Sequence, residues 1–290
     1  MTSKKTIALT ALTMLFFAAN SLLARFALRS GEIDAGSFTA IRIGAGAAAL
    51  ALIVRLRRGG SGMDGRHGSV PAGAALFGYA IAFSYAYLLL NASTGALVLF
   101  AAVQLTMLGS GIARGEHPNT EEWSGLALAF GGLVYLVFPG LSAPAPAGVL
   151  LMAFSGIAWG FYSIAAKGVQ SPVAATAGNF ARAVPMAAGT LAALWVFGRP
   201  HVTWTGAGVA ALSGAITSGL GYALWYTALK DLRTSVAAIV QLTVPLLTAA
   251  FGVVLLGEQL TLRLVVASAA ILGGVALALM GKFRAQSTAN

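Results

Sequence analysis

The sequence lacks cysteine and is poor in charged residues. None of its 290 residues is cysteine, which excludes disulfide scaffolds, thiol catalysis, iron–sulfur clusters and cysteine-based zinc sites. Charged residues make up 9% of the chain, whereas a soluble domain has about a quarter. Aspartate and glutamate together number eight and histidine three, so few groups are present to build an acid–base or metal centre. These shortages argue against a soluble enzyme.

Apolar sequence dominates instead. Hydrophobic residues make up 58% of the chain and form runs long enough to cross a bilayer, which takes about 20 residues each. Backbone groups inside a bilayer need partners, so such runs must be helices or strands of a closed barrel, and the alternation typical of barrel strands is absent. We predict an all-α membrane protein of ten transmembrane helices, at about residues 6–28, 35–54, 71–90, 93–113, 122–138, 145–166, 172–197, 204–228, 233–256 and 261–281.

The basic residues predict the orientation. If the N-terminus is cytoplasmic, cytoplasmic segments hold most of the eighteen lysines and arginines, and external loops hold only Arg29, Arg199 and Arg263. This bias places both termini in the cytoplasm. It also explains the net charge of +10 without nucleic acid as a partner. We expect a multi-pass protein of the cell inner (cytoplasmic) membrane, with the lipid bilayer as its surroundings.

Landmarks in the first half of the chain recur in the second. Gly115-Glu116 precedes a glycine pair at 131–132, and Gly257-Glu258 precedes one at 273–274 with the same spacing. In the same register, residues 17–25 (FAANSLLAR) align with residues 159–167 (WGFYSIAAK). Any two membrane helices share apolar residues by chance, but an ordered set of polar and glycine landmarks favours a repeat. We predict two five-helix repeats, residues 1–140 and 141–290, within one membrane domain.

Five helices per repeat is an odd number, so the second repeat would insert upside down relative to the first. Inverted repeats are an architecture of transporters, in which a site between two similar halves faces one side of the membrane and then the other. Receptors and structural membrane proteins do not need this symmetry. The repeat therefore favours transport.

The landmarks also resemble the EamA-type permeases of the drug/metabolite transporter superfamily, over nearly the whole chain. In that family each half carries a Gly-Glu pair at the end of its fourth helix, matched here by Gly115-Glu116 and Gly257-Glu258. A glycine-rich fifth helix follows each pair, and Arg42 and Arg182 match a basic position early in the second helix of each half. The resemblance implies a ten-helix secondary transporter.

One feature departs from the family pattern, which commonly has a proline in the fourth helix of each half. Pro245 supplies it in the second half, but residues 106–108 of the first half contain none. Within the superfamily the chain is most similar to the YddG-type exporters of aromatic amino acids. That resemblance implies an amino acid as the small-molecule substrate.

Aromatic residues are the first candidates for a substrate-binding site. They recur at helical spacing well inside the predicted spans, where they would form an apolar cavity able to stack a flat side chain. Aromatic residues near span ends, by contrast, belong to the interfacial belt. The aromatic candidates for substrate binding are Tyr79, Phe83, Trp159, Tyr162, Tyr222 and Trp225.

Polar residues inside spans are the second group of candidates, because each needs a partner or water. Asn20 and Gln241 are predicted to bind the polar end of the substrate, although such residues also serve as hydrogen bonds between helices. Arg42 and Arg182 suit a substrate carboxylate, but their position near helix ends favours side chains that extend to the membrane surface. Arg25, nearer to a helix end, is interpreted as a membrane anchor.

The acidic residues bear on energy coupling. All eight fall in loops or at span ends, whereas an ion-coupled carrier typically keeps an ionisable group within the membrane. We therefore expect facilitated, uncoupled transport, although Glu116 or Glu258 could still couple transport to protons if the fold buries it. No Walker loop, zinc motif or nucleophile elbow is present, so no enzymatic activity and no cofactor or metal site is predicted.

The function predicted from sequence is export of small amphipathic metabolites, above all aromatic and other apolar amino acids, by alternating access through a central cavity. The alternative is a proton-coupled multidrug or quaternary-amine efflux pump, because aromatic rings also attract organic cations. The sequence leaves the oligomeric state open.

Overall fold

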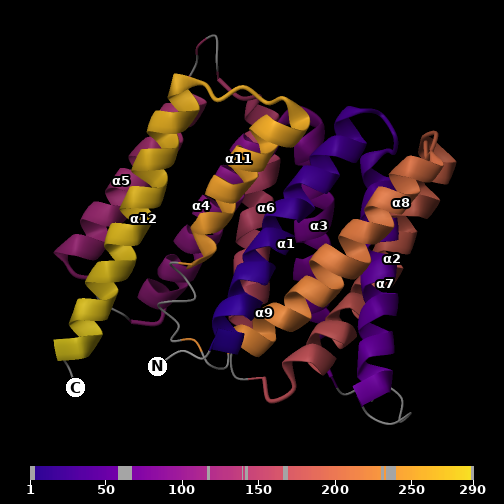
Figure 1. The fold of residues 1–290 in the computed structure, drawn as a ribbon, viewed down its shortest axis with the longest axis horizontal. Coiled ribbons are helices and arrows are strands. Elements are labelled where there is room, and N and C mark those ends of the chain that lie inside the picture. The colour runs from indigo at the N-terminus through magenta and orange to yellow at the C-terminus, as the bar shows by residue number, and fades with distance from the viewer. Residues whose placement is uncertain are drawn as a thin grey trace.

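The fold is an array of helices, as the computed structural model in Figure 1 shows. The structure describes residues 4–57, 67–115, 118–138, 140, 143–165, 169–229, 232 and 240–288. Among them the only β pairing is an isolated bridge between Ile33 and Val202. The all-helical prediction is therefore confirmed for the described chain.

The helices follow the predicted apolar runs closely. Those up to residue 140 are α1 (Lys4–Arg29), α2 (Ala35–Arg57), α3 (Val70–Leu89), α4 (Ala92–Ala113) and α5 (Thr120–Val137). Those beyond are α6 (Pro146–Ala165), α7 (Pro172–Phe197), α8 (Trp204–Leu212), η1 (Ser213–Leu220), α9 (Gly221–Leu229), α11 (Thr243–Leu256) and α12 (Leu262–Thr288). The elements α8, η1 and α9 are consecutive in sequence, and η1 has π-helical hydrogen bonding.

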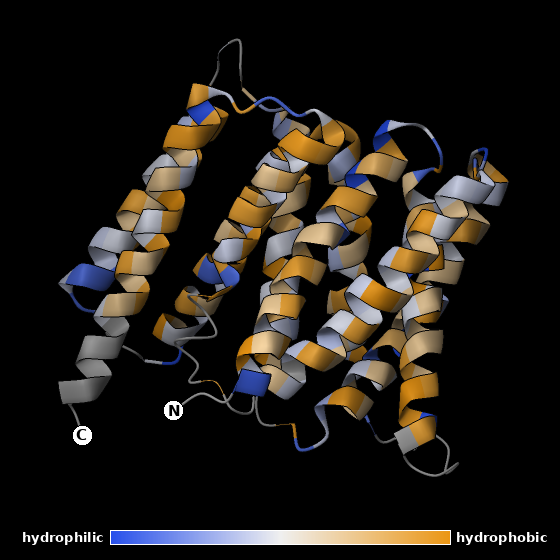
Figure 2. Cartoon of the chain, in the orientation of Figure 1, coloured by the Kyte–Doolittle hydropathy of each residue, from blue (hydrophilic) through white to orange (hydrophobic). Residues whose placement is uncertain are grey.

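Within the described part of the chain, eight helical segments are long and apolar enough to cross a membrane. Figure 2 shows apolar residues along the helices and hydrophilic residues mainly where helices end. Two predicted spans fall outside these eight. One coincides with α5, whose 18 residues begin with Thr120 and two glutamates, and the other with α11, which has 14 described residues. The count of ten stays a prediction.

Local signals explain where several helices begin and end. Ser69 accepts a hydrogen bond from the Ala72 amide at the start of α3, and Asn119 forms a capping box with Glu122 at the start of α5. Helix α11 ends at Gly257, whose φ of 63° lies in the left-handed region that favours glycine.

Helices from the two halves of the chain pack against each other in a regular pattern. Helix α2 packs on α7, α4 on α11 and α5 on α12, so helices at corresponding positions in the two halves meet. Helix α1, the first of its half, contacts η1 and α9, which belong to the third span of the other half. Helix α3, the third of its half, contacts α6, the first of the other half. The α5–α12 pair lies at one edge of the array (Figure 1).

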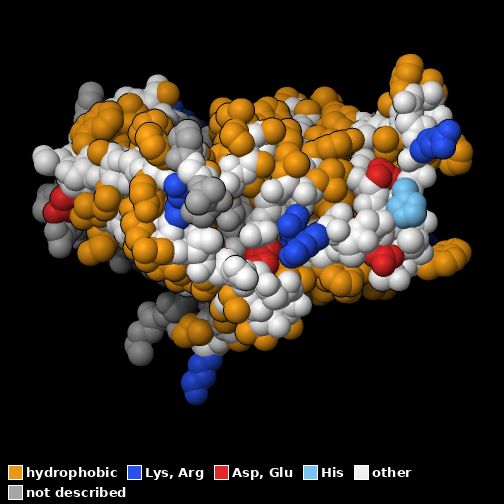
Figure 3. All heavy atoms as spheres, turned by 90° about the horizontal axis from the view of Figure 1, so that it is seen from above, with side chains coloured by type: hydrophobic (Ala, Val, Ile, Leu, Met, Phe, Trp, Pro, Cys, Tyr) orange, Lys and Arg blue, Asp and Glu red, His pale blue; other side chains and the backbone are white. Residues whose placement is uncertain are grey.

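The start of α1 and the end of α12 lie at the same end of the array, the terminal end (Figure 1). The opposite end, which carries the α1–α2 turn, is called the distal end. There the turn joins the α7–α8 connection, because Asp34 N donates to His201 O at 2.9 Å and Thr203 N donates to Glu32 O at 2.9 Å. Figure 3 views the distal end, where a few charged and histidine side chains lie among uncharged ones and apolar side chains surround them.

Candidate substrate-binding site

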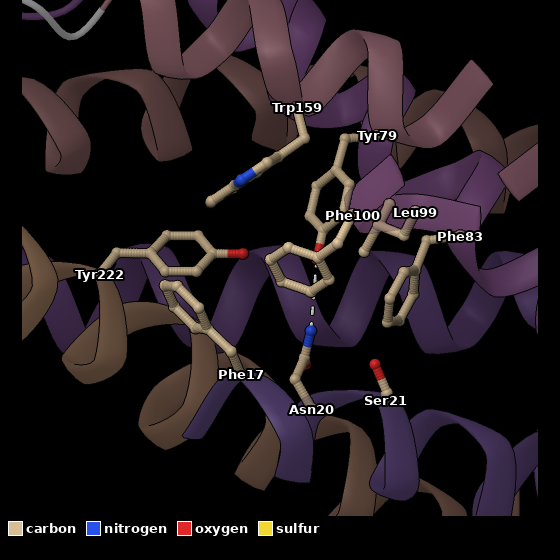
Figure 4. Close-up of a pocket in the computed structure, with 9 residues that line it drawn as sticks. All are labelled: Phe17, Asn20, Ser21, Tyr79, Phe83, Leu99, Phe100, Trp159 and Tyr222. Carbon is tan, nitrogen blue, oxygen red and sulfur yellow. Dashed lines mark hydrogen bonds between the residues drawn. The ribbon is translucent and has the colours of Figure 1, made fainter. Parts of the chain in front are cut away.

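A small cavity lies where helices from both halves of the chain meet (Figure 4). Its volume is about 20 Å³, which is room for about one water molecule. Helices α1, α3 and α4 supply lining residues from the first half, and α6 and α9 supply them from the second. The lining residues are Phe17, Asn20, Ser21, Tyr79, Phe83, Leu99, Phe100, Trp159 and Tyr222.

Aromatic rings make up most of this lining, and Trp159 is at their centre. Its ring centroid lies 4.8 Å from that of Tyr79, 4.8 Å from that of Tyr222 and 6.3 Å from that of Phe17. Tyr79 in turn lies 5.4 Å from Phe83. These separations are in the range of favourable ring–ring contacts. Four of the predicted aromatic residues, Tyr79, Phe83, Trp159 and Tyr222, therefore line one cavity.

The other two predicted aromatic residues stand behind the lining. The ring of Tyr162 lies 5.2 Å from Trp159, and the ring of Trp225 lies 6.0 Å from Phe17. Both are buried, but neither lines the cavity. They pack against the lining rings from behind, away from the cavity.

Asn20 is one of the polar residues of the lining, and its amide connects three elements. Its Nδ2 donates to the Tyr79 hydroxyl at 3.3 Å, the hydrogen bond drawn in Figure 4. Its Oδ1 accepts from Ser213 Oγ at 2.7 Å and from Thr217 Oγ1 at 3.1 Å. At the edge of the cavity, Asn20 thus makes hydrogen bonds between helices, which is the alternative role predicted for it from the sequence.

The π-helical segment η1 brings these hydroxyls to the site. Ser213, Thr217 and Ser218 are buried on η1, which packs on both α1 and α2. The contact with α2 is close, because a Cβ added at Gly214 would overlap the carbonyl oxygen of Arg42. Short π-helical segments inside α-helices are frequent at functional sites.

Arg42 lies inside the protein, which corrects the prediction that it extends to the membrane surface. Its side chain is 2% exposed. Its Nη2 donates to the Tyr79 hydroxyl at 2.8 Å, and its Nε donates to Ser218 Oγ at 3.1 Å. The guanidinium carbon lies 4.7 Å from the ring centroid of Phe83. The prediction was wrong because α2 is covered by α3, α7 and η1, so its first turns face protein rather than lipid.

Arg25 is also buried, which corrects its interpretation as an anchor. Its Nη1 donates to Tyr87 O at 2.7 Å, and its Nε lies 3.9 Å from Glu258 Oε1. Among the described residues this is the only pair of opposite charges within 4.0 Å. The loop after α11 carries Glu258 to this position at the distal end.

Glu258 is 4% exposed and caps a helix of the other half. Its carboxylate accepts from the amide of Ala92 at 2.6 Å and from the amide and hydroxyl of Ser93 at 3.2 and 3.1 Å. These are the first residues of α4, whose own N-cap, Asn91, makes no side-chain capping bond. An anion at a helix N-terminus is favourable because free amides and the helix dipole point toward it.

Other predicted residues lie away from the cavity. Gln241 is buried but does not line it. Arg182 is half-buried and donates to His67 O at 2.7 Å, beside the start of α3 at the terminal end. Glu116 lies outside the described residues.

Comparison with known proteins places the chain in a family. The sequence model of the EamA-like transporter family matches it twice, over residues 4–138 and 146–280. The chain belongs to the EamA-like transporter family. It is accordingly a multi-pass membrane protein that transports small solutes rather than an enzyme.

Two relatives of this EamA-like protein cover almost its whole length. An uncharacterized protein of Pseudomonas aeruginosa is 50% identical over 279 residues, which are 96% of either chain. An uncharacterized transporter of Archaeoglobus fulgidus is 28% identical over 274 residues, which are 89% of this chain and 91% of the relative. A solved protein crystal structure matches 97% of this chain and 100% of its own, with a TM-score of 0.67 and 22% identity, and so supports the fold.

Sequence reasoning missed several residues around the cavity of this EamA-like protein. Phe17 and Ser21 share a face of α1 with Asn20, and this spacing was visible in the sequence. Leu99 and Phe100 carry no signal that separates them from lipid-facing residues. The hydroxyls that contact Asn20 and Arg42 lie on the π-helical segment η1, a local geometry that the sequence does not reveal.

Proposed function

We propose that this EamA-like protein exports small amphipathic metabolites, above all aromatic and other apolar amino acids, across the cell inner membrane. The observation that carries the proposal is the small aromatic cavity, to which both halves of the chain contribute. Aromatic rings arranged face and edge around a small space suit a flat apolar side chain, which would replace ring–ring contacts with its own. The polar groups around Asn20 suit the charged end of an amino acid.

The proposed mechanism is alternating access between two inverted five-helix halves, residues 1–140 and 141–290. A cavity of about 20 Å³ is far smaller than an amino acid, so the lining helices must separate before substrate enters. Pairing of helices at corresponding positions supports a movement in which one half rocks against the other.

We propose further that transport is uncoupled. Among the described residues no carboxylate lines the cavity, so no acidic group is at hand to exchange a proton for substrate. Substrate would then move down its own gradient, which suffices to export a metabolite that accumulates in the cell.

The second candidate function is proton-coupled multidrug or quaternary-amine efflux. The burial of Glu258 favours it, because a buried carboxylate can take up and release a proton during a transport cycle. Against it, the aromatic cavity lies next to the positive charge of Arg42, which repels organic cations.

Counterflow in proteoliposomes tests the proposal. Vesicles are preloaded with one unlabelled compound and exposed to a trace of its labelled form, without an ion gradient. The panel contains aromatic and aliphatic amino acids and a quaternary amine. We expect labelled phenylalanine to accumulate and the quaternary amine not to accumulate. Absence of counterflow for every amino acid, with quaternary-amine transport driven by an imposed pH gradient, would replace this proposal with the second candidate.

A further inference from the structure

Arg42 carries a buried positive charge without an acidic partner among the described residues. Its hydrogen-bond acceptors at 2.8 and 3.1 Å, Tyr79 and Ser218, are neutral hydroxyls, and the Tyr222 hydroxyl is a further neutral neighbour. The remaining guanidinium nitrogen, Nη1, is buried and has no hydrogen-bond partner within the described part of the chain. Glu258, the acidic side chain of the ion pair among the described residues, lies beside Arg25 instead of Arg42.

Such an arrangement is costly for the free protein. An arginine stays protonated in proteins, so it cannot avoid the cost by losing its charge. Burying a charge without a counter-ion costs several kcal/mol, and leaving a buried donor unpaired adds to this cost. A ligand that supplies a negative charge and an acceptor would relieve both.

The position of Arg42 connects this charge to the cavity. Its guanidinium contacts two lining residues, by the hydrogen bond to Tyr79 and by stacking 4.7 Å from the ring centroid of Phe83. Asn20, a polar residue of the lining, donates to the same Tyr79 hydroxyl. Figure 4 shows that hydroxyl turned toward Asn20.

We propose that Arg42 is the carboxylate-binding residue of the site, so that the substrates are carboxylates with an aromatic or other apolar body. The planar guanidinium presents two parallel donors that fit a carboxylate, and the rings opposite hold the apolar body. Amines without a carboxylate are excluded by charge repulsion. This inference rests on the proposed transport function and narrows its substrate class.

Ligand binding to the purified full-length protein tests the inference. The matched probes are 3-phenylpropionate and 3-phenylpropionamide, which share a shape and differ in charge, and 2-phenylethylamine as a cation. Binding is measured from the rise in the thermal unfolding midpoint with probe concentration. We expect the wild type to bind the carboxylate at least about tenfold more tightly than the amide, since charge-assisted bidentate hydrogen bonds are strong. The amine should bind most weakly.

Variants assign the preference to Arg42. In Arg42→Gln the carboxylate and the amide should bind within about threefold of each other, because the charge is gone. Arg42→Lys should keep part of the preference, since it retains the charge without the planar fork. Arg114→Gln is the control, because Arg114 is exposed just after the end of α4 and donates to Ser110. It should bind the probes as the wild type does.

The outcomes separate this inference from the proposed function. Equal binding of carboxylate and amide by the wild type would overturn the inference, and so would a full preference in Arg42→Gln. If Arg42→Gln does not fold, the wild-type comparison and Arg42→Lys still decide. A carboxylate preference in binding, with no counterflow of any amino acid, would leave the inference standing and contradict the proposed amino-acid transport.

Discussion

At the scale of the residue, Trp159 has more ring contacts within the cavity than any of its neighbours. It contacts Phe17, Tyr79, Tyr162 and Tyr222, and it is 7% exposed. Its helix, α6, comes from the second half of the chain, whereas Tyr79 and Phe17 come from the first. Trp159 therefore joins the aromatic surfaces of the two halves.

Truncation of Trp159 should impair substrate binding. In Trp159→Ala we expect uptake at low substrate concentration to fall about tenfold or more, because a buried aromatic side chain contributes about 1.5–3 kcal/mol of apolar contact. The matched control is Trp204→Ala, since Trp204 is 95% exposed at the start of α8. Initial rates of counterflow across substrate concentrations measure the effect. A folded Trp159→Ala protein with wild-type rates would rule out this cavity as the binding site.

Residue types in the sequence predicted the aromatic lining of the cavity well and the burial of Arg42 poorly. Tyr79, Phe83, Trp159 and Tyr222 sit inside long apolar runs, where interfacial anchoring is implausible, and all four are buried. Arg42 sits about two turns into its helix, and only the packing of neighbouring helices decides whether such a side chain faces lipid or protein. That information is tertiary, so sequence periodicity did not contain it.

At the scale of the element, η1 and the loop after α11 determine how the halves meet. The π-helical segment approaches α2 so closely that Gly214 has no room for a side chain. The loop after α11 turns at Gly257 and brings the Glu258 carboxylate to the start of α4. The Gly-Glu pair noted in the sequence therefore has a structural role in the second half, as a helix end followed by a cap for another helix.

Gly214→Ala tests the contact between η1 and α2. The added methyl group would overlap the backbone of Arg42, and overpacking of this kind typically costs about 1–3 kcal/mol. We expect a lower thermal unfolding midpoint and weaker substrate binding, because η1 carries the hydroxyls that contact Asn20 and Arg42. Gly208→Ala is the matched control on the preceding helix, where an added Cβ meets nothing within 4 Å. Equal midpoints for the two variants would show that the contact is not tight.

Glu258→Gln tests the cap on α4. Loss of the charge weakens the bonds to the Ala92 and Ser93 amides and leaves Arg25 without its acidic neighbour. We expect the variant to be less stable by about 1–3 kcal/mol, the usual effect of losing a charged partner of buried groups. Chemical or thermal unfolding followed by tryptophan fluorescence measures the change. The double variant Arg25→Gln/Glu258→Gln should be more stable than the sum of the single effects implies. Additive effects would show that the two side chains do not interact.

The long apolar runs made the helices predictable, because length and composition decide which segments can cross a bilayer. The π-helical hydrogen bonding of η1 was not predictable, since Ser213–Leu220 reads as an ordinary apolar helix. Glu258 was correctly placed in a loop, but its burial depends on how that loop meets the other half of the chain.

At the scale of the whole molecule, the two halves enclose the cavity and are joined at the distal end. The carboxylate of Glu258 joins α4 there, and the α1–α2 turn is bonded to the α7–α8 connection around the Ile33–Val202 bridge. The proposed alternating access requires the halves to separate at each end in turn. A covalent bond across the distal end should therefore stop the cycle.

The double variant Ile33→Cys/Val202→Cys places such a bond. The chain has no cysteine of its own, so the new pair can form one disulfide without competition. Backbone hydrogen bonds flank the bridge on both sides, and opposed Cα atoms in this arrangement are about 4.5 Å apart, within the range of a disulfide. The single-cysteine variants are the controls for the substitutions themselves.

The most direct test of alternating access is amino-acid counterflow by this double variant before and after reduction. We predict that the oxidised protein carries no counterflow, that a reducing agent restores it, and that each single-cysteine variant transports in both conditions. Full counterflow by protein shown to be cross-linked would contradict separation of the halves at the distal end, and with it the proposed transport cycle.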